Sequence, residues 1–255
     1  NRREKRGSRR SGNKSVIFSA QISDRNRKFP TAIKNTPTSG IRSTAEIAAT
    51  LKAGTGLNHS VRVAQPLELP EANLLIDPYV LGAWLGDGVG VSGIISGIDS
   101  ELFVNVANAG YKVTQHKNPT SHGVWGLKEK LNALGVLGNK HIPTAYLRAS
   151  KKQRLELLRG VMDTDGYCDT RGQCEITLTN KRLSEDVHEL ILSLGAKCTI
   201  KESDAKLNGR YISPRYRMKF LMSESAFRLS RKLIRQKQSD FRGTHDRRYI
   251  AKADL

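Results

Sequence analysis

The chain has 255 residues, of which 38% are hydrophobic and 6% aromatic. This length is enough for one large domain or two small ones with a modest core. No apolar run approaches the roughly 20 residues that a membrane-spanning helix needs, and the N-terminal residues do not form a signal peptide, so no membrane partner is expected. Its three cysteines, Cys168, Cys174 and Cys198, are too few and too irregularly spaced for a disulfide framework or a zinc site.

The net charge of +19 is concentrated in two regions. Residues 1–30 hold ten Lys and Arg against two acids, and residues 201–250 hold fourteen against five, which leaves +2 for the other 175 residues. Concentrated charge is typical of proteins that bind a phosphate backbone. The alternatives are a merely soluble basic protein or a membrane-surface segment, but no basic amphipathic helix with an aromatic face is present. We therefore expect a nucleic-acid partner and a cytoplasmic, nucleoid-associated protein.

The first seventy residues contain few predicted elements. Residues 1–14 have no apolar periodicity and are expected to be disordered on their own. A short helix is predicted at 44–51, opened by Ser43, and a strand at 59–64. We interpret residues 1–74 as a basic N-terminal extension that could serve as a DNA-contacting arm.

From residue 75 the pattern repeats. Asp77-Pro78 is a strong helix start, with Asp as N-cap and Pro at the first helical position. Gly-x-Lys-x-Thr begins at Gly110 and again at Gly195. The sequence predicts a duplicated α+β module with pseudo-two-fold symmetry, its halves at 75–149 and 150–255. The predicted elements of the first half are a helix at 78–86, a polar strand near 89–97, a helix at 99–109, a strand from 110, and a strand and helix within 124–134. Those of the second are a helix at 151–164 opened by Ser150, a strand at 173–179, a helix at 184–194, a strand from 195, and a strand and helix within 216–233.

The first helix of each half ends in Asp-Gly. Small residues lie four apart on each helix, at Gly82 and Gly86 and at Gly160 and Thr164. Residues four apart share one helix face, so the two backbones could approach closely there. Asp87 and Asp165 would then emerge side by side, and two such carboxylates repel unless a divalent cation lies between them. Oxygen ligands of this kind suit magnesium and metal-assisted phosphodiester hydrolysis.

Two simpler interpretations compete for the Asp-Gly pairs. Glycine commonly ends a helix, which would explain one copy. An EF-hand loop needs glycine at its sixth position, whereas Asp163-Thr164-Asp165-Gly166 has it at the fourth. Two matched copies within a duplicated unit favour the metal site.

The two helix ends resemble the paired LAGLIDADG motifs of single-chain homing endonucleases, closely at Leu158–Gly166 and more loosely at Val80–Gly88. The surrounding sequence resembles the endonuclease region of inteins, particularly those of bacterial replicative helicases. The matching blocks lie at 80–88, 140–143, 158–167 and 176–195.

This resemblance implies two αββαββα halves in an α+β fold, with antiparallel sheets that form a saddle over double-stranded DNA. It implies a monomer that cuts both strands of a long, asymmetric target site with Mg²⁺ or another divalent cation such as Mn²⁺. The metals would be bound by Asp87 and Asp165, assisted by the carbonyls of Gly86 and Thr164. Lys140 would be catalytic, stabilising charge or orienting water near the scissile phosphates; otherwise it is a solvated loop lysine. Its counterpart in the second half stays open, with Lys237 as one candidate.

Base contacts are expected from outward-facing strand residues, because strand Arg and Lys in a major groove can read guanine edges, whereas loop residues usually hold phosphates. The helix at 228–233 is expected to contact phosphate or face solvent. The DNA-contact candidates are Ser92, Ser96, Gln115, Lys117, Thr177, Thr179, Lys197, Lys201, Arg210, Arg215, Arg217 and Lys219.

Two other functions compete with a nuclease. A non-cleaving DNA- or RNA-binding protein, such as a regulator or a maturase, could use the same scaffold, although two repelling carboxylates favour the nuclease. Self-splicing would need Cys or Ser at residue 1 and a C-terminal His-Asn pair. Since Asn1 and Leu255 stand there, we expect this stretch not to splice.

Overall fold

The computed structural model describes residues 40–236 and 247–255. The described residues from Ile47 onward belong to one compact unit, which contains both predicted halves. The described residues contain no helix long and apolar enough to cross a membrane.

Short elements precede the duplicated region. Helix α1 (Thr44–Ala49) begins after Ser43, as predicted, and the strands β1 (Lys52–Ala53) and β2 (Gly56–Leu57) form a hairpin. The strand predicted at 59–64 is present but shorter, as β3 (Ser60–Arg62). It pairs antiparallel with β11 (Arg247–Tyr249), and the 3-10 helix η2 (Lys252–Asp254) follows β11. This pairing of distant segments was not predicted.

The first half contains α2 (Pro78–Asp87), β4 (Ile94–Ser96), α3 (Ser100–Asn108), β5 (Val113–Gln115), β6 (Ser121–Val124) and α4 (Leu127–Ala133). Its strands lie in the order β4-β6-β5, and Gly88 forms an isolated bridge to Ile95. The prediction of a strand across 89–97 was therefore wrong at its start. The Val89 amide donates to the Ile94 carbonyl at 2.9 Å, which turns the chain back on itself and leaves three residues in β4.

The second half contains α5 (Thr144–Leu147), α6 (Lys151–Asp165), β7 (Gly166–Cys168), β8 (Cys174–Leu178), α7 (Lys181–Ser193), β9 (Lys197–Leu207), β10 (Arg210–Leu221) and α8 (Ser230–Leu233). Helix α7 begins three residues before the predicted start, because the Asn180 side chain accepts from the Leu183 amide at 3.1 Å and caps the helix there. The antiparallel sheet has the order β7-β8-β10-β9. The first half repeats this order, with the Gly88 bridge in place of β7, so the predicted duplicated αββαββα fold is confirmed.

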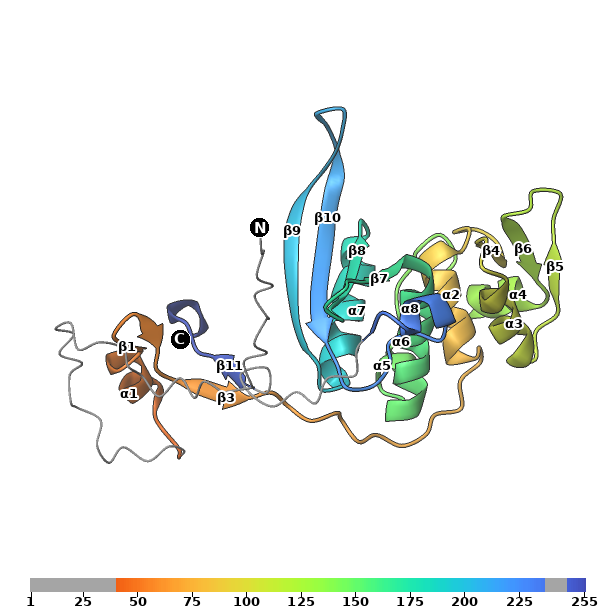
Figure 1. The fold of residues 1–255 in the computed structure, drawn as a ribbon. Helices are drawn as coiled ribbons and strands as arrows, with labels where there is room; N and C mark the ends of the chain where they lie inside the picture. The colour runs from red at the N-terminus through yellow and green to blue at the C-terminus, as the bar shows by residue number, and fades with distance from the viewer. Residues whose placement is uncertain (1–39, 237–246) are drawn as a thin grey trace, which may run out of the picture. The chain divides into compact units, whose positions relative to one another are not determined.

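Helices α2 and α6 lie side by side between the two sheets (Figure 1). Both begin as predicted: the Asp77 carboxylate accepts from the Tyr79 and Val80 amides, and Ser150 forms a capping box with Gln153. Seven of the ten residues of α2 are buried, including Trp84 and Leu85. Fully burying a side chain such as Leu stabilises the fold by about 1.5–3 kcal/mol, so this helix pair forms the centre of the core.

Candidate active site at the paired helix ends

The two central helices touch through their glycines. A Cβ built on Gly82 would overlap the Leu157 carbonyl and lie 3.1 Å from the Cα of Gly160. A Cβ on Gly160 would overlap the Tyr79 carbonyl and lie 2.6 Å from the Ala83 amide nitrogen. Backbone therefore packs directly on backbone, as the small-residue pattern predicted.

This contact brings the two helix ends together. A Cβ on Gly86 would lie 3.3 Å from Oδ2 of Asp165 and overlap the Thr164 hydroxyl. Asp87 is half-buried, and Asp165 is more exposed as a residue although its carboxylate lies against the end of α2. Desolvation of the carboxylate and the neighbouring Asp87 charge raise the pKa of Asp165 to about 6. Desolvation also raises the pKa of Asp87. The two carboxylates are thus close enough to repel each other.

The glycines after the two aspartates are needed for space rather than for an unusual backbone angle. Gly88 and Gly166 both have extended conformations, with φ of −73° and −80°. A Cβ on Gly88 would lie 2.6 Å from Cγ of Trp84, and one on Gly166 would lie 2.7 Å from the Cα of Met162. Asp-Gly does end each helix, as the simpler interpretation expected, but it does not end it in a turn, because each chain passes straight from helix into strand pairing.

Lys140 lies at the end of α2. Its Nζ donates to the carbonyls of Leu85 and Gly86, at 3.0 and 2.9 Å, and lies 5.2 Å from the centre of the Trp84 ring. Burial lowers the pKa of Lys140, while the Asp165 and Asp87 carboxylates raise it. The structure therefore brings Lys140 together with both aspartates.

Lys232 occupies the matching place at the end of α6, a position that was not predicted from the sequence. Its buried Nζ lies within hydrogen-bonding distance of four carbonyls, those of Met162, Asp163, Thr164 and Gly166, at 2.9, 2.6, 3.1 and 2.7 Å. Burial, together with the charge of the adjacent Arg231, lowers its pKa to about 8.

The expectation of a solvated face at 228–233 was wrong for this lysine, because its buried ammonium caps the carbonyls of α6. The other alternative, a phosphate contact, stays a prediction. Lys237, the candidate counterpart, lies outside the described residues. No fixed spacing distinguishes Lys232 from Arg228, Arg231 or Lys237 in the sequence, so only the fold identifies it.

Each lysine is held in place by the opposite half. The segment that carries Lys140 is bonded to α7, where Asn180 Nδ2 donates to the Lys140 carbonyl at 3.2 Å and Asp186 accepts from the Ile142 amide at 2.8 Å. Helix α8, which carries Lys232, is bonded to the start of α3. There Asp99 pairs with Arg231 at 2.5 Å and Glu101 accepts from the Ser230 amide and hydroxyl. Helices α3 and α7 are equivalent elements of the repeat, so the arrangement is reciprocal.

A second aspartate of α6, Asp163, is structural. It is 2% exposed, accepts from the Tyr79 hydroxyl at 2.8 Å, and accepts from the Arg228 and Leu229 amides at 3.1 and 3.2 Å. Leu229 is the residue before α8. Asp163 thereby joins α2, α6 and the start of the helix that carries Lys232.

The basic candidates of the second half share one sheet face. Arg217 in β10 lies directly opposite Thr177 in β8 and Lys201 in β9, and all three are exposed. The residues between them, such as Ile176 and Met218, are buried. The same register puts Lys197, Arg215 and Lys219 on this outward face, and Arg210 joins it opposite Leu207, beyond a bulge between Tyr211 and Ser213.

The remaining candidates lie elsewhere. Thr179 follows β8, Lys117 lies in the β5–β6 turn, and Ser96 lies in β4. Two others already make contacts within the chain: Gln115 donates to the Pro119 carbonyl at 2.9 Å, and the Ser92 carbonyl accepts from the Trp84 indole at 2.8 Å.

An acid that was not among the predicted residues lies within the basic face. Glu175 binds Arg217 through both carboxylate oxygens, at 2.5 and 2.7 Å, and lies 3.2 Å from Lys219. The Arg217 guanidinium, followed by the Lys219 ammonium, holds the pKa of Glu175 below its usual value. A bidentate pair fixes the plane of the guanidinium, so Arg217 is oriented before any ligand binds.

Residues 152–242 match the model of the LAGLIDADG-like domain family. This range contains the α6 helix end with Asp165, the basic sheet and Lys232. This part of the chain resembles a LAGLIDADG-like domain. The resemblance predicted from the sequence is thereby confirmed at the level of family.

The chain is 41% identical over 207 residues to the replicative DNA helicase DnaB of Mycobacterium intracellulare. The alignment covers 80% of this chain and 34% of that protein, so the chain spans about a third of its relative. The match agrees with the predicted relation to inteins of replicative helicases.

Two structures of the homing endonuclease I-DmoI also align with the chain. One is of mesophilic variants, with a TM-score of 0.39, 18% identity and coverage of 57% of this chain and 88% of that one. The other is of a variant in complex with its target DNA in the presence of manganese, with a TM-score of 0.38, 17% identity and coverage of 57% and 86%. The fold assignment rests on the helix pair and strand order described above.

Proposed function

We propose that the protein is a site-specific endonuclease that hydrolyses both strands of double-stranded DNA at the Asp87–Asp165 pair. The observation that carries this proposal is the convergence of two carboxylates at the axis of a duplicated fold, each helix end flanked by a lysine. Asp87 and Asp165 would bind divalent metal, and Lys140 would be catalytic. Lys232 is added as its second-half counterpart.

The donor set fits a hard cation. Two carboxylates and the backbone carbonyls of Gly86 and Thr164 offer oxygen only, which suits Mg²⁺ or Mn²⁺ and leaves coordination positions for phosphate and water. Each carbonyl has two lone pairs, so accepting from Lys140 or Lys232 leaves one free. When bound, the ions would polarise the scissile phosphate and promote attack by water.

The chain's own groups would bind and orient the duplex. The two lysine ammonium groups would stabilise the negative charge that develops on the phosphates. The outward sheet faces would bind the DNA, with seven of the predicted contact residues on β8, β9 and β10 and with Thr179 and Lys117 at turns. The second sheet has strands of 11 and 12 residues where the first has 3 and 4. Unequal halves fit a long, asymmetric site. We propose that the protein binds it as a monomer and that it does so in the nucleoid, where its DNA lies.

The test compares Asp87→Asn and Asp165→Asn with wild type and with Glu185→Gln. Glu185 is an exposed carboxylate on α7, so its variant is a matched control. Duplexes that the protein binds are first selected from a library of random sequences and uninterrupted helicase-gene segments, and are then cloned into a plasmid. Wild type and Glu185→Gln should linearise the plasmid with Mg²⁺, while both aspartate variants should bind the target without cutting. Cleavage of both strands at the wild-type rate by either aspartate variant would refute the metal assignment.

One observation favours the second candidate, a DNA- or RNA-binding protein that does not cleave. Both carbonyls proposed as metal ligands already accept from lysines, at 2.9 and 3.1 Å. If the two ammonium groups stay bound there and their positive charge keeps the cation off the remaining lone pairs, the site is silent. Retention of the selected duplex by wild type, without cutting in Mg²⁺ or Mn²⁺, would identify this binder.

A further inference from the structure

The ribbon formed by β3 and β11 places two arginines face to face. Arg62 lies directly opposite Arg247 in the antiparallel register, so both side chains are on the same side of the ribbon. Like charges directly opposite each other destabilise a strand pair. Neither arginine has an acidic partner among the ion pairs of the described residues; Arg247 reaches only the Ser60 hydroxyl, at 3.4 Å. This arrangement leaves a place for an anion.

The ribbon is fixed beside the basic sheet. The Lys197 ammonium, at the start of β9, donates to the Arg247 carbonyl at 3.1 Å. The segment that follows β3 is also anchored, since the Leu67 amide donates to the Ser193 carbonyl at 2.9 Å. A Cβ on Gly195 would lie 2.7 Å from Cδ of Pro66, so the segment that follows β3 packs tightly against the turn before β9.

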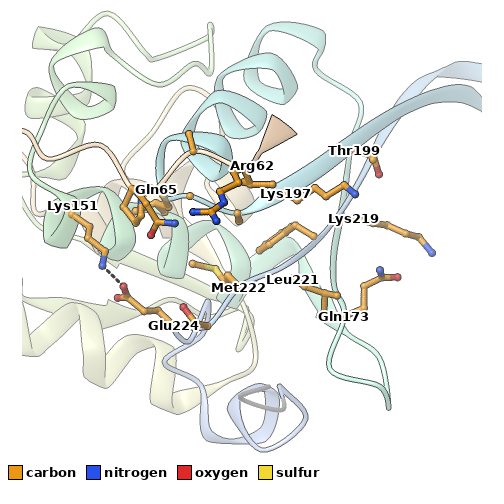
Figure 2. A pocket seen from close by; sticks show the side chains of 18 of the residues that line it. Arg62, Gln65, Lys151, Gln173, Lys197, Thr199, Lys219, Leu221, Met222 and Glu224 are labelled. Carbon is orange, nitrogen blue, oxygen red and sulfur yellow. Dashed lines mark ion pairs between the residues drawn. The ribbon is translucent and has the colours of Figure 1, made fainter. Parts of the chain in front are cut away.

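A pocket of about 890 Å³ lies where the ribbon meets the sheet. Lys151 and Glu224 form an ion pair on one side of it, and Lys197, Thr199 and Lys219 lie on the other (Figure 2). Arg62 also lines it, and Glu68 is its second acid. Glu68 forms no ion pair in the part of the chain that the structure describes, so Arg62 and Lys197 keep their charge available.

We propose that this ribbon and pocket bind the sugar–phosphate backbone of the duplex at the flank next to the second half. The inference deepens the proposed function and rests on its DNA partner. Lys197 and Lys219 belong both to the outward sheet face and to the pocket, so a duplex on that face reaches the pocket wall. A backbone phosphate between Arg62 and Arg247 neutralises their repulsion. Such contacts add affinity and register, not base specificity.

The experiment uses the full chain with Arg62→Gln, Arg247→Gln and the control Lys152→Gln. Lys152 is an exposed lysine at the start of α6, the opposite end of that helix from Asp165. Affinity for the selected duplex is measured against salt without Mg²⁺, with a hydroxyl-radical footprint of each complex. Each arginine variant should reduce the slope of log K against log salt by about one, the value for one phosphate contact. It should also shorten the footprint at one end only, while Lys152→Gln behaves as wild type.

The free protein supplies a second readout. Arg62→Gln should melt at or above the temperature of wild type, because it removes a like-charge pair. An unchanged salt slope and footprint in Arg62→Gln would overturn the proposal. If the protein makes the flank contact but never cuts DNA, only the proposal of endonuclease activity is contradicted. If it cuts DNA but its footprint is confined to the two sheets, only the proposal that the ribbon binds DNA is contradicted.

Discussion

Replacing Gly82 with alanine should lower the free energy of unfolding, although alanine has the higher helix propensity. The added Cβ would overlap the Leu157 carbonyl and lie 3.0 Å from the Val161 amide nitrogen. Both atoms belong to helix backbone, so no side-chain rotation can relieve the contact, and α2 must move away from α6.

The expected cost follows from two opposing contributions. Overpacking a core costs typically up to about 3 kcal/mol, and the backbone overlap at Gly82 places this variant at that upper end. Alanine inside a helix stabilises the protein by about 1 kcal/mol relative to glycine, because of its higher helix propensity. The net loss of unfolding free energy is therefore about 2 kcal/mol, and Gly160→Ala should lose a similar amount, since it meets the Tyr79 carbonyl and the Ala83 amide.

Urea denaturation measures this loss. Gly82→Ala and Gly160→Ala should lower the midpoint without changing the slope, which reports a change in stability rather than in the surface exposed. Gly90→Ala is the matched control, because a Cβ there has no atom within 4 Å. A midpoint for Gly82→Ala equal to that of Gly90→Ala would refute the close packing of α2 on α6. Plasmid cleavage at 25 °C should fall as well, because separating the helices separates Asp87 from Asp165.

Three further variants test other parts of the site. Lys232→Met leaves carbonyls of α6 without their donor and should destabilise the protein by about 1–3 kcal/mol in denaturant. The pKa of Lys232 is about 8 in the folded protein, whereas an unfolded lysine titrates near 10.4, so the unfolded chain binds more protons between pH 8 and about 10.4. The free energy of unfolding should therefore rise with pH in this range, and this rise should vanish in Lys232→Met. Asp87→Asn removes a charge that raises the pKa of Asp165, so a ¹³C NMR titration should place that pKa below about 6; no change would mean that the carboxylates are far apart. Glu175→Gln releases Arg217, and competition binding should show tighter non-specific DNA binding with less discrimination; unchanged discrimination would contradict an orienting role.

Local signals predicted the parts of this fold that depend on neighbouring residues. Asp77 and Ser150 predicted the starts of their helices because each side chain, as an N-cap, accepts hydrogen bonds from free amides of the first turn. The glycines of α2 and α6 predicted the helix contact because spacing by four puts them on one face. The same helix contact places the two aspartates at neighbouring helix ends, so the pairing of their carboxylates could be predicted from the sequence.

What the sequence did not reveal depends on pairing across the chain. Strand β11 joins β3 from nearly two hundred residues away, and no pattern in either segment specifies the other. Glu175 could be recognised as a partner of Arg217 only once the β8–β10 register was known, because a shift of one residue would turn it into the core. Lys232 was hidden for another reason: lysine is rarely buried, so a basic helix suggested a solvated face.

The reciprocal anchoring explains why the site needs both halves. The segment of Lys140 is held by Asn180 and Asp186 of the second half, yet its ammonium binds carbonyls of α2 in the first. Helix α8 is held by Asp99 and Glu101 of the first half, yet Lys232 binds carbonyls of α6 in the second. A cation at a helix C-terminus is favoured by the partial negative charge there, so each lysine also stabilises the helix end that presents an aspartate. Moving either half would therefore displace both lysines, which couples the integrity of the site to the α2–α6 contact.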